Sequence, residues 1–233
     1  MSISLPGFDA WLTERLEECA GDSGENVDFY VARAVAAQMI SDCERADVAS
    51  AGPLKARLTQ SGLSGETVSD GISSVLADPR RVHALNSTGL MGAPSDPTLD
   101  RVARTAAGAL ATPAAAVVLV GAESQSLAGA CGVDPASPPK HLVDLAESFD
   151  KYVVVNESLV RVENAAHHPL FGKYSIVAEG RIAAYLGVPL TDDAGNTVGV
   201  LSVFDSSPRK WKNGHIQILD DLASVAKGRM FHG

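Results

Sequence analysis

The sequence predicts an α+β fold, in which an antiparallel sheet carries helices on one face and follows an all-helical N-terminal region. Two observations lead to this prediction. Residues 1–90 place apolar side chains at helical spacing without a strand pattern, whereas β-branched runs and tight turns alternate after residue 113. We therefore divide the chain into a helical N-terminal region, residues 1–90, and a second domain, residues 91–233.

Helices in the N-terminal region are predicted from apolar spacing and from their start signals. Apolar residues within 8–16 and within 30–39 recur at i, i+3 and i+4, which places them on one face of a helix. Aspartate–proline pairs at 78–79 and 96–97 each predict a helix start. The aspartate side chain accepts hydrogen bonds from first-turn N–H groups, and proline fits the first helical position.

The second domain contains two predicted hairpins. The apolar run 114–120 is typical of a central strand, and 125–131 can pair back onto it. Strands at 181–190 and 197–204 flank an Asp-Asp-Ala-Gly turn at 192–195. Tight turns of this kind join antiparallel strands, so the sheet is expected to be antiparallel.

The remaining segments of this domain are less regular. Leu142, Leu145, Ala146 and Phe149 form a helical stripe, and Tyr152 to Val155 has the pattern of a short strand. Residues 159–162 fit a strand or a helical turn, and 163–177 fits a loop with a short helix. A final helix from Ile216 to Met230 is expected to lie beside the helix that begins after residue 96, on the same face of the sheet.

Composition excludes several classes of function. A net charge of −9 disfavours nucleic acids and anionic membranes, because their phosphates repel such a surface. The three cysteines are widely spaced and show neither a disulfide framework nor a zinc pattern, which is typical of a reducing cytosol. No apolar run reaches the roughly 18 residues of a membrane span. We expect a cytoplasmic protein, and its alanine, valine and aspartate content suggests a bacterium with a GC-rich genome.

Two strand motifs near the C-terminus resemble the end of a GAF domain. The first is Tyr185-Leu186-Gly187-Val188-Pro189-Leu190, which is similar to the family's Tyr-x-Gly-x-Pro-Leu strand. The second runs from Gly199 to Asp205 and is followed by Pro208-Arg209, as in the family. Weaker matches lie between Ser148 and Leu170, and the resemblance covers about residues 84–230.

The resemblance implies a sensory module with a ligand pocket on the sheet face opposite the helices. Members of the family bind cyclic nucleotides, haem, tetrapyrroles, small anions or other metabolites, or bind nothing and dimerise. The cyclic-nucleotide signature is absent here, because Asn164 is followed by alanine instead of lysine. The branch that reduces methionine sulfoxide needs several cysteines, but this half has only Cys131, whereas thiol attack and resolution need two. We therefore expect a protein that is not an enzyme and that has no catalytic or metal-ligating residues.

The candidate ligand-binding residues each have a structural alternative. Either imidazole of an adjacent histidine pair could ligate haem or contact an anion, or both could be solvated, and at most one would point inward. The aspartate candidate could contact a ligand or cap a helix-to-strand junction, and the aromatic candidates could be core residues. The full set is Asp150, Asn164, His167, His168, Phe171 and Tyr185.

Three functions remain open from the sequence. The first is a regulator that binds a small-molecule ligand and relays it through the N-terminal helices to a partner signalling protein. The second is an interaction module, a homodimer whose pocket is filled. The third is a haem or redox sensor that uses His167 or His168.

Overall fold

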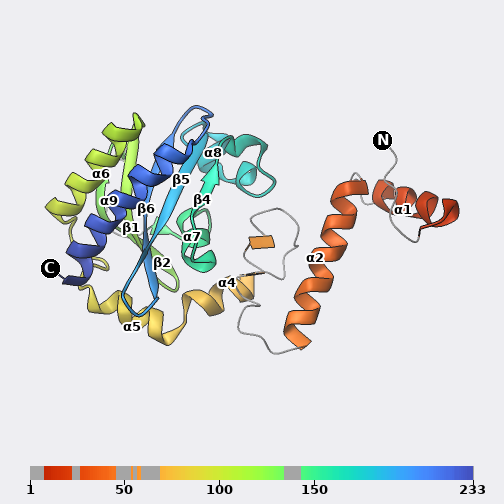
Figure 1. Cartoon of the computed structure of the whole chain (residues 1–233), viewed down its shortest axis with the longest axis horizontal. Helices are drawn as coiled ribbons and strands as arrows, with labels where there is room; N and C mark the ends of the chain where they lie inside the picture. Colours follow the sequence, from red (N-terminus) through yellow and green to blue (C-terminus); the bar gives the residue numbers. More distant parts are fainter. Residues whose placement is uncertain are drawn as a thin grey trace.

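The computed structural model describes residues 8–22, 27–45, 54, 57–58, 69–133 and 143–232. The helices α1 (Ala10–Asp22), α2 (Val27–Arg45), α4 (Ser69–Leu76) and α5 (Pro79–Ser87) precede the sheet. In Figure 1, α1 and α2 lie to one side, whereas α4 and α5 run along the edge of the sheet domain. No described helix is both long enough and apolar enough to cross a bilayer.

The sheet has six strands in the order β3-β2-β1-β6-β5-β4, and every neighbouring pair is antiparallel. This confirms the predicted fold class and both predicted hairpins. The strands are β1 (Ala114–Val120), β2 (Ser124–Cys131), β3 (Val143–Asp144), β4 (Val160–Val162), β5 (Ala184–Thr191) and β6 (Thr197–Asp205).

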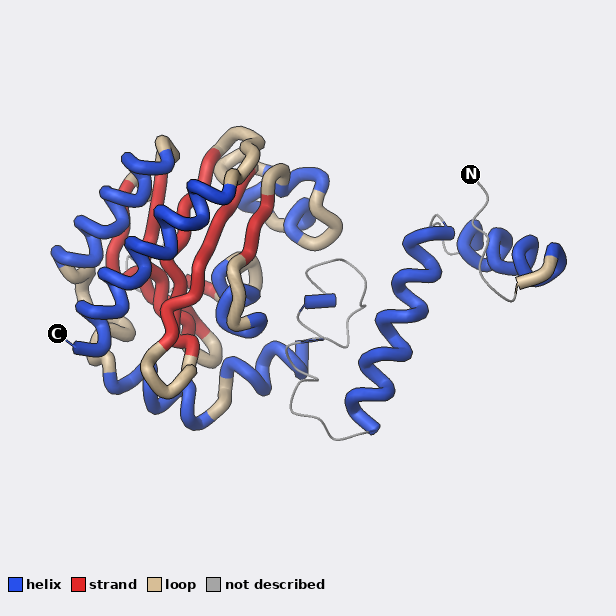
Figure 2. Tube along the Cα trace, viewed as in Figure 1, coloured by secondary structure: helices blue, strands red, loops and turns tan. Residues whose placement is uncertain are grey.

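The two long helices of the domain lie together on one face of the sheet, as the sequence predicted. Figure 2 shows α6 (Pro97–Leu110) and α9 (Asn213–His232) running across the strands. Their apolar sides and alternate residues of β1, β5 and β6 form one buried cluster. Arg229 on α9 also donates to Asp96 Oδ2 at 2.6 Å, which ties the end of one helix to the start of the other.

The two aspartate side chains that were predicted to cap helix starts do so. Asp78 Oδ1 accepts from the Arg80 N–H at 2.8 Å, and Asp96 Oδ1 accepts from the Thr98 N–H at 2.8 Å. At the other end of α6, Arg209 donates to the carbonyl oxygens of Leu110 and Ala111 at 2.6 and 2.8 Å. The Pro-Arg motif after β6 therefore satisfies carbonyls that the helix leaves without partners.

The opposite face of the sheet is covered by short elements. These are α7 (Asp150–Asn156), the 3-10 helices η2 (Ala165–His167) and η3 (Phe171–Lys173), and α8 (Ser175–Ala178). Together with α4 they enclose a second apolar cluster against β1, β5 and β6. The sheet is thus buried on both faces, which explains why its strands are almost continuously apolar.

Two predictions for the middle of the domain were wrong. The segment from Tyr152 to Val155 lies in helix α7, although its valines favour a strand. All four side chains are buried because the helix lies between the sheet and α4, so its sequence shows no polar face. The helical stripe that was expected to end at Phe149 contains β3 and a turn instead, and its first residue, Leu142, lies outside the described residues.

Helices α4 and α5 connect the N-terminal region to the sheet. Leu76 is buried in the second cluster, and Leu85 is buried in the first. The buried Arg81 guanidinium donates to the Val120 carbonyl at 2.6 Å and also to the Leu76 carbonyl. One side chain therefore fixes the end of α4 to the end of the central strand β1.

Candidate functional site

Asp150 is the first residue of α7, and its carboxyl group is buried beneath the short elements that cover the sheet. The Tyr185 hydroxyl donates a hydrogen bond to Oδ1 of Asp150 at 2.7 Å. Burial disfavours the charged carboxylate and raises the pKa of Asp150 to about 6, although the hydrogen bond from Tyr185 and the nearby hydroxyl of Ser202 partly oppose the change. This carboxyl group therefore changes its charge close to neutral pH.

Ser202 is the buried polar residue beside this pair. It lies in β6, directly across from Gly187 of β5. Its hydroxyl favours the charged forms of both Asp150 and Tyr185, yet Oγ has no hydrogen bond of regular geometry within the described residues. A buried hydroxyl without a partner is uncommon, and it marks a position where a further polar group could bind.

Gly187 allows Tyr185 to reach Asp150. A Cβ atom on Gly187 would lie 2.2 Å from the Tyr185 hydroxyl oxygen, which is far inside contact distance. The tyrosine ring therefore lies along its own strand, over the position where residue 187 lacks a side chain. The Tyr-x-Gly spacing of the motif thus has a local geometric reason.

Aromatic rings surround the buried carboxyl group. The Phe149 ring centroid lies 4.3 Å from that of Phe171, 5.0 Å from that of Tyr185 and 5.6 Å from that of Tyr174. Tyr152 packs edge-on against Phe171 at 5.6 Å. We call Phe149, Tyr152, Phe171, Tyr174 and Tyr185 the aromatic cluster.

His168 covers this cluster from the loop between η2 and η3. Its ring stacks on Phe171 with centroids 4.4 Å apart. Its Nδ1 atom accepts from the backbone N–H groups of Leu170 and Phe171, both at 3.3 Å. Burial lowers the pKa of His168, which favours the neutral ring that these hydrogen bonds require.

Glu147 holds the covering segment to the loop before α7. Its Oε2 atom accepts from both the backbone N–H and the hydroxyl of Ser175, at 2.9 and 2.5 Å. These hydrogen bonds lower the pKa of Glu147. The start of α8 is thereby attached to residues just ahead of Asp150.

The structure brings part of the predicted candidate set together. Asp150, Phe171 and Tyr185 meet in the buried cluster, and His168 lies against it. Asn164 Nδ2 and His167 Nδ1 lie 3.3 Å apart, and no described side-chain contact joins either residue to Asp150. The two adjacent histidines thus differ in orientation, and of the two only His168 faces the aromatic cluster. This agrees with the expectation that at most one of them points inward.

The sequence reasoning missed four residues of this site. Phe149 and Tyr152 were assigned to a helical stripe and a strand, and Tyr174 was left within a loop. Ser202 carried a readable signal, because it is a polar residue two positions after Val200, which lies in the apolar cluster on the Asp150 side of the sheet. Its partner across the sheet is Gly187, two residues after Tyr185 in the β5 motif.

A groove lies elsewhere on the domain. It has a volume of about 740 Å³ and runs between α5, the β5–β6 turn and the end of α9. Its polar lining includes Arg80, His83, Asp193 and His232. None of its lining residues belongs to the aromatic cluster, so the buried carboxyl group and this open groove are separate features.

The cysteines are distant from the buried carboxyl group. Cys131 is partly buried and packs against the cluster on the α6 and α9 face of the sheet. Cys19 lies in α1 and Cys43 in α2. The pair of thiols that a reductase of the methionine sulfoxide type requires is therefore not assembled beside Asp150.

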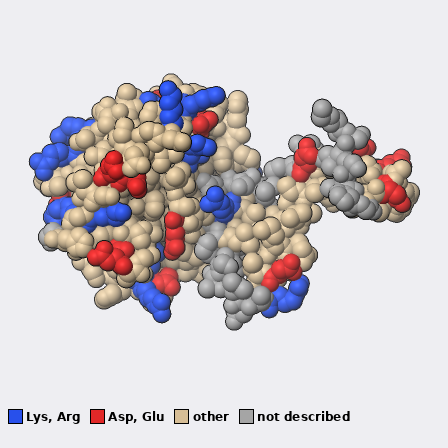
Figure 3. Space-filling model, viewed as in Figure 1, with Lys and Arg blue, Asp and Glu red and all other residues tan. Residues whose placement is uncertain are grey.

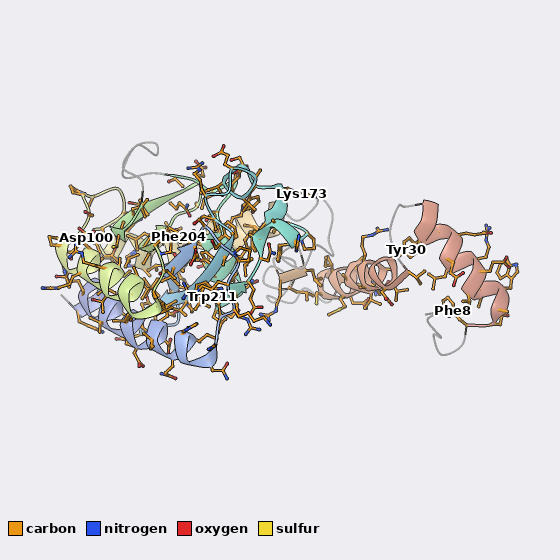
Figure 4. All side chains as sticks on the ribbon, turned by 90° about the horizontal axis from the view of Figure 1, so that it is seen from above. Phe8, Tyr30, Asp100, Lys173, Phe204 and Trp211 are labelled. Carbon is orange, nitrogen blue, oxygen red and sulfur yellow. The ribbon has the colours of Figure 1, made fainter. Side chains whose placement is uncertain are left out.

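Charged side chains are distributed over the visible surface. Figure 3 shows lysine, arginine, aspartate and glutamate interspersed on this face of the sheet domain. In the view from above, the half-buried Phe204 lies in the sheet domain, whereas Phe8 and Tyr30 lie with the N-terminal helices (Figure 4).

Comparison with known proteins identifies the domain. The model of the GAF domain family matches residues 95–228. No match is found among curated proteins.

Solved structures with similar folds include the GAF domain of an Acinetobacter phosphoenolpyruvate-protein phosphotransferase, at 21% identity, with 66% of this chain and 95% of that chain covered and a TM-score of 0.48. A free methionine-R-sulfoxide reductase from Neisseria meningitidis is 18% identical, with 69% and 84% covered and a TM-score of 0.46. A domain of a sensor histidine kinase from Sinorhizobium meliloti 1021, described as putative, is 20% identical, with 56% and 86% covered and a TM-score of 0.43. Since the family model spans more than half of the sequence, this chain belongs to the GAF domain family.

Proposed function

We propose that this protein is a non-catalytic regulator that binds a small ligand at the aromatic cluster and relays binding to a partner protein. The observation that carries the proposal is the buried Asp150 carboxyl group. A core that served packing alone would gain nothing from an ionisable group, because burying its charge is costly. Ionisable groups with strongly shifted pKa values concentrate at functional sites.

The proposed relay runs through α7 to α4. Asp150 begins α7, and the buried side chains of α7 share one apolar cluster with Ile72, Val75 and Leu76 of α4. A ligand that displaced a ring of this cluster would also change the packing of α4. Because Arg81 fixes the end of α4 to β1, the change would be transmitted as a tilt of α4 about that fixed end.

The proposed output surface lies on the N-terminal helices. Trp11 of α1 is 65% exposed, and Val35 and Met39 of α2 are also exposed. Large exposed apolar side chains of this kind are common where another protein binds. We propose that they contact a partner signalling protein or a second copy of the chain in a homodimer. The three free cysteines suit a reducing cytoplasm.

Hydrogen exchange tests the relay. The protein is mixed with fractions of a bacterial metabolite extract, and exchange is compared for residues 165–178 and for α4. We expect an active fraction to change protection in both segments, because they share the apolar cluster. If fractions that stabilise the protein alter residues 165–178 while α4 exchanges as before, the proposed relay is wrong.

An interaction module without a ligand is the second candidate. The observation that favours it is the close mutual packing of the aromatic rings, which fills the space over Asp150. Light scattering at several concentrations, with the wild type and Trp11→Ala, tests this candidate. If this candidate is correct, the protein self-associates in a way that depends on Trp11, and no fraction of any extract stabilises the protein.

Haem does not fit His168 as it is arranged. Its Nδ1 atom accepts from two backbone N–H groups, so the neutral ring carries its proton on Nε2 and neither nitrogen offers iron a free lone pair; the ring also lies flat on Phe171. A macrocycle would have to displace several rings of the aromatic cluster, whereas a small ligand would need to displace one. We therefore derive no function through haem.

A further inference from the structure

We propose that the ligand of this site is a small organic cation, either an amine or a quaternary ammonium ion, held between the rings of the aromatic cluster and the carboxylate of Asp150. The inference rests on the proposed ligand-binding function and adds the chemical class of the ligand. Three features of the site support it, namely an unpaired carboxylate, the faces of aromatic rings and a hydroxyl group without a partner.

Among the described residues, no positively charged side chain pairs with the Asp150 carboxylate. The groups that act on Asp150 are the hydroxyls of Tyr185 and Ser202 and its own backbone N–H, and no basic side chain of the described residues is among them. The Nζ atom of the adjacent Lys151 donates to the carbonyls of Leu145 and Ala146 at 2.7 and 2.8 Å and lies 5.3 Å from the ring centroid of Tyr152. A buried carboxylate is stabilised by a cation, so a positively charged ligand would supply what the chain does not.

The walls of the site favour the same charge. Phe149 lies between Phe171 and Tyr185 and contacts both rings. Ring faces carry partial negative charge and attract desolvated cations, most strongly where several rings converge. An anionic ligand would meet both these faces and the carboxylate, and a neutral ligand would leave the carboxylate unpaired.

The unpartnered hydroxyl adds a polar contact. Ser202 Oγ is fully buried beside Asp150 and can accept a hydrogen bond from an ammonium N–H. Phe171 and His168 lie on the short segment that covers the site, so displacement of the Phe171 ring would open the space that a small cation needs.

Calorimetric titration with small cations tests the inference. The probes are methylammonium, tetramethylammonium and choline, and 3,3-dimethylbutan-1-ol is the neutral control with the shape of choline. We expect at least one cation to bind at least tenfold more tightly than the neutral alcohol. In NMR spectra, the methyl protons of the bound cation should shift upfield, because aromatic rings surround them. Asp150→Asn is expected to lose at least tenfold in affinity, whereas Asp220→Asn on the exposed side of α9 binds as the wild type does.

The pH dependence of binding provides a second readout that requires no variant. Cation affinity should rise as pH increases through the pKa of Asp150, about 6, and level off above it. Tyr152, Tyr174 and Tyr185 have raised pKa values and stay neutral in this range, and Glu147 has a lowered pKa and stays charged. Burial lowers the pKa of His168, so this ring can also lose a proton as pH rises; His168→Gln is therefore included and is expected to keep the rise in affinity.

The outcomes separate this inference from the function on which it rests. If none of the three cations binds better than the neutral alcohol, or if affinity does not change with pH, the cation assignment is wrong. A neutral or anionic metabolite that bound at the same rings would then leave the regulatory function standing. If no extract fraction stabilises the protein either, both proposals fall.

Discussion

Replacing Asp150 with asparagine removes the charge from the buried carboxyl position and keeps its shape. Because burial raises the pKa of Asp150 from 3.8 to about 6, the folded protein binds this proton more tightly than the unfolded chain does. The carboxyl group therefore costs stability as pH rises from about 4 to above 6. A shift of about two pKa units corresponds to roughly 3 kcal/mol of unfolding free energy.

Urea unfolding at a series of pH values measures this cost. The buried Trp211 reports on the domain when the exposed Trp11 is replaced by phenylalanine in both proteins. We expect the wild type to lose about 2.5 kcal/mol relative to Asp150→Asn between pH 4 and pH 7.5, because a small part of the full cost is already present at pH 4. Asp96, Asp192 and Glu147 have lowered pKa values and act in the opposite direction, but they cancel in the comparison.

Two results would refute this reasoning. If the stability curves of the wild type and Asp150→Asn run parallel with pH, the carboxyl group is not held in the environment described. If the wild type gains on the variant as pH rises, a positive partner must stabilise the carboxylate. The matched variant Asp220→Asn, on an exposed position of α9, is expected to follow the wild type throughout.

Three further substitutions test other contacts. Gly187→Ala places a methyl group against the Tyr185 hydroxyl and is expected to destabilise the domain by about 1–3 kcal/mol in urea, whereas Gly228→Ala in α9, where a Cβ meets nothing within 4 Å, should be neutral or stabilising. Arg81→Met leaves the Leu76 and Val120 carbonyls without their donor and should cost about 2 kcal/mol or more, with faster hydrogen exchange in α4, while the exposed Arg80→Met should do neither. Trp11→Ala should change the unfolding free energy by less than about 0.5 kcal/mol, because Trp11 is exposed. If α1 is the dimer contact, this substitution should also reduce self-association in light scattering, whereas unchanged association would show that α1 is not the contact.

The sequence predicted the regular parts of this domain well because their signals are local. The Asp-Pro pairs act through hydrogen bonds within one helical turn, and the turn at 192–195 joins strands that pair directly. Helix α7 was missed because its character depends on distant neighbours. Residues from Tyr152 to Val155 are apolar on every side, since α4 covers them as well as the sheet.

The candidate site was predicted in part for the same reason. Tyr185 and Phe171 were identifiable from their motif and loop, and Asp150 from its place in a weak family match. Their meeting depends on Gly187, which lets the tyrosine ring lie along β5 toward the start of α7. The sequence could not predict which of the adjacent residues His167 and His168 faces the aromatic cluster, because this depends on the backbone path through η2 and η3.

The sequence by itself determined the fold class, the family and the acidic character of this protein, since these follow from periodicity, motifs and composition. Only the tertiary structure decided that a carboxyl group, a tyrosine and an unpartnered serine hydroxyl meet inside an aromatic cluster. Those residues come from α7, β5 and β6, which are separated in the chain and brought together by the strand order of the sheet. Burial of a charge is a property of that assembled environment, and no local sequence pattern encodes it.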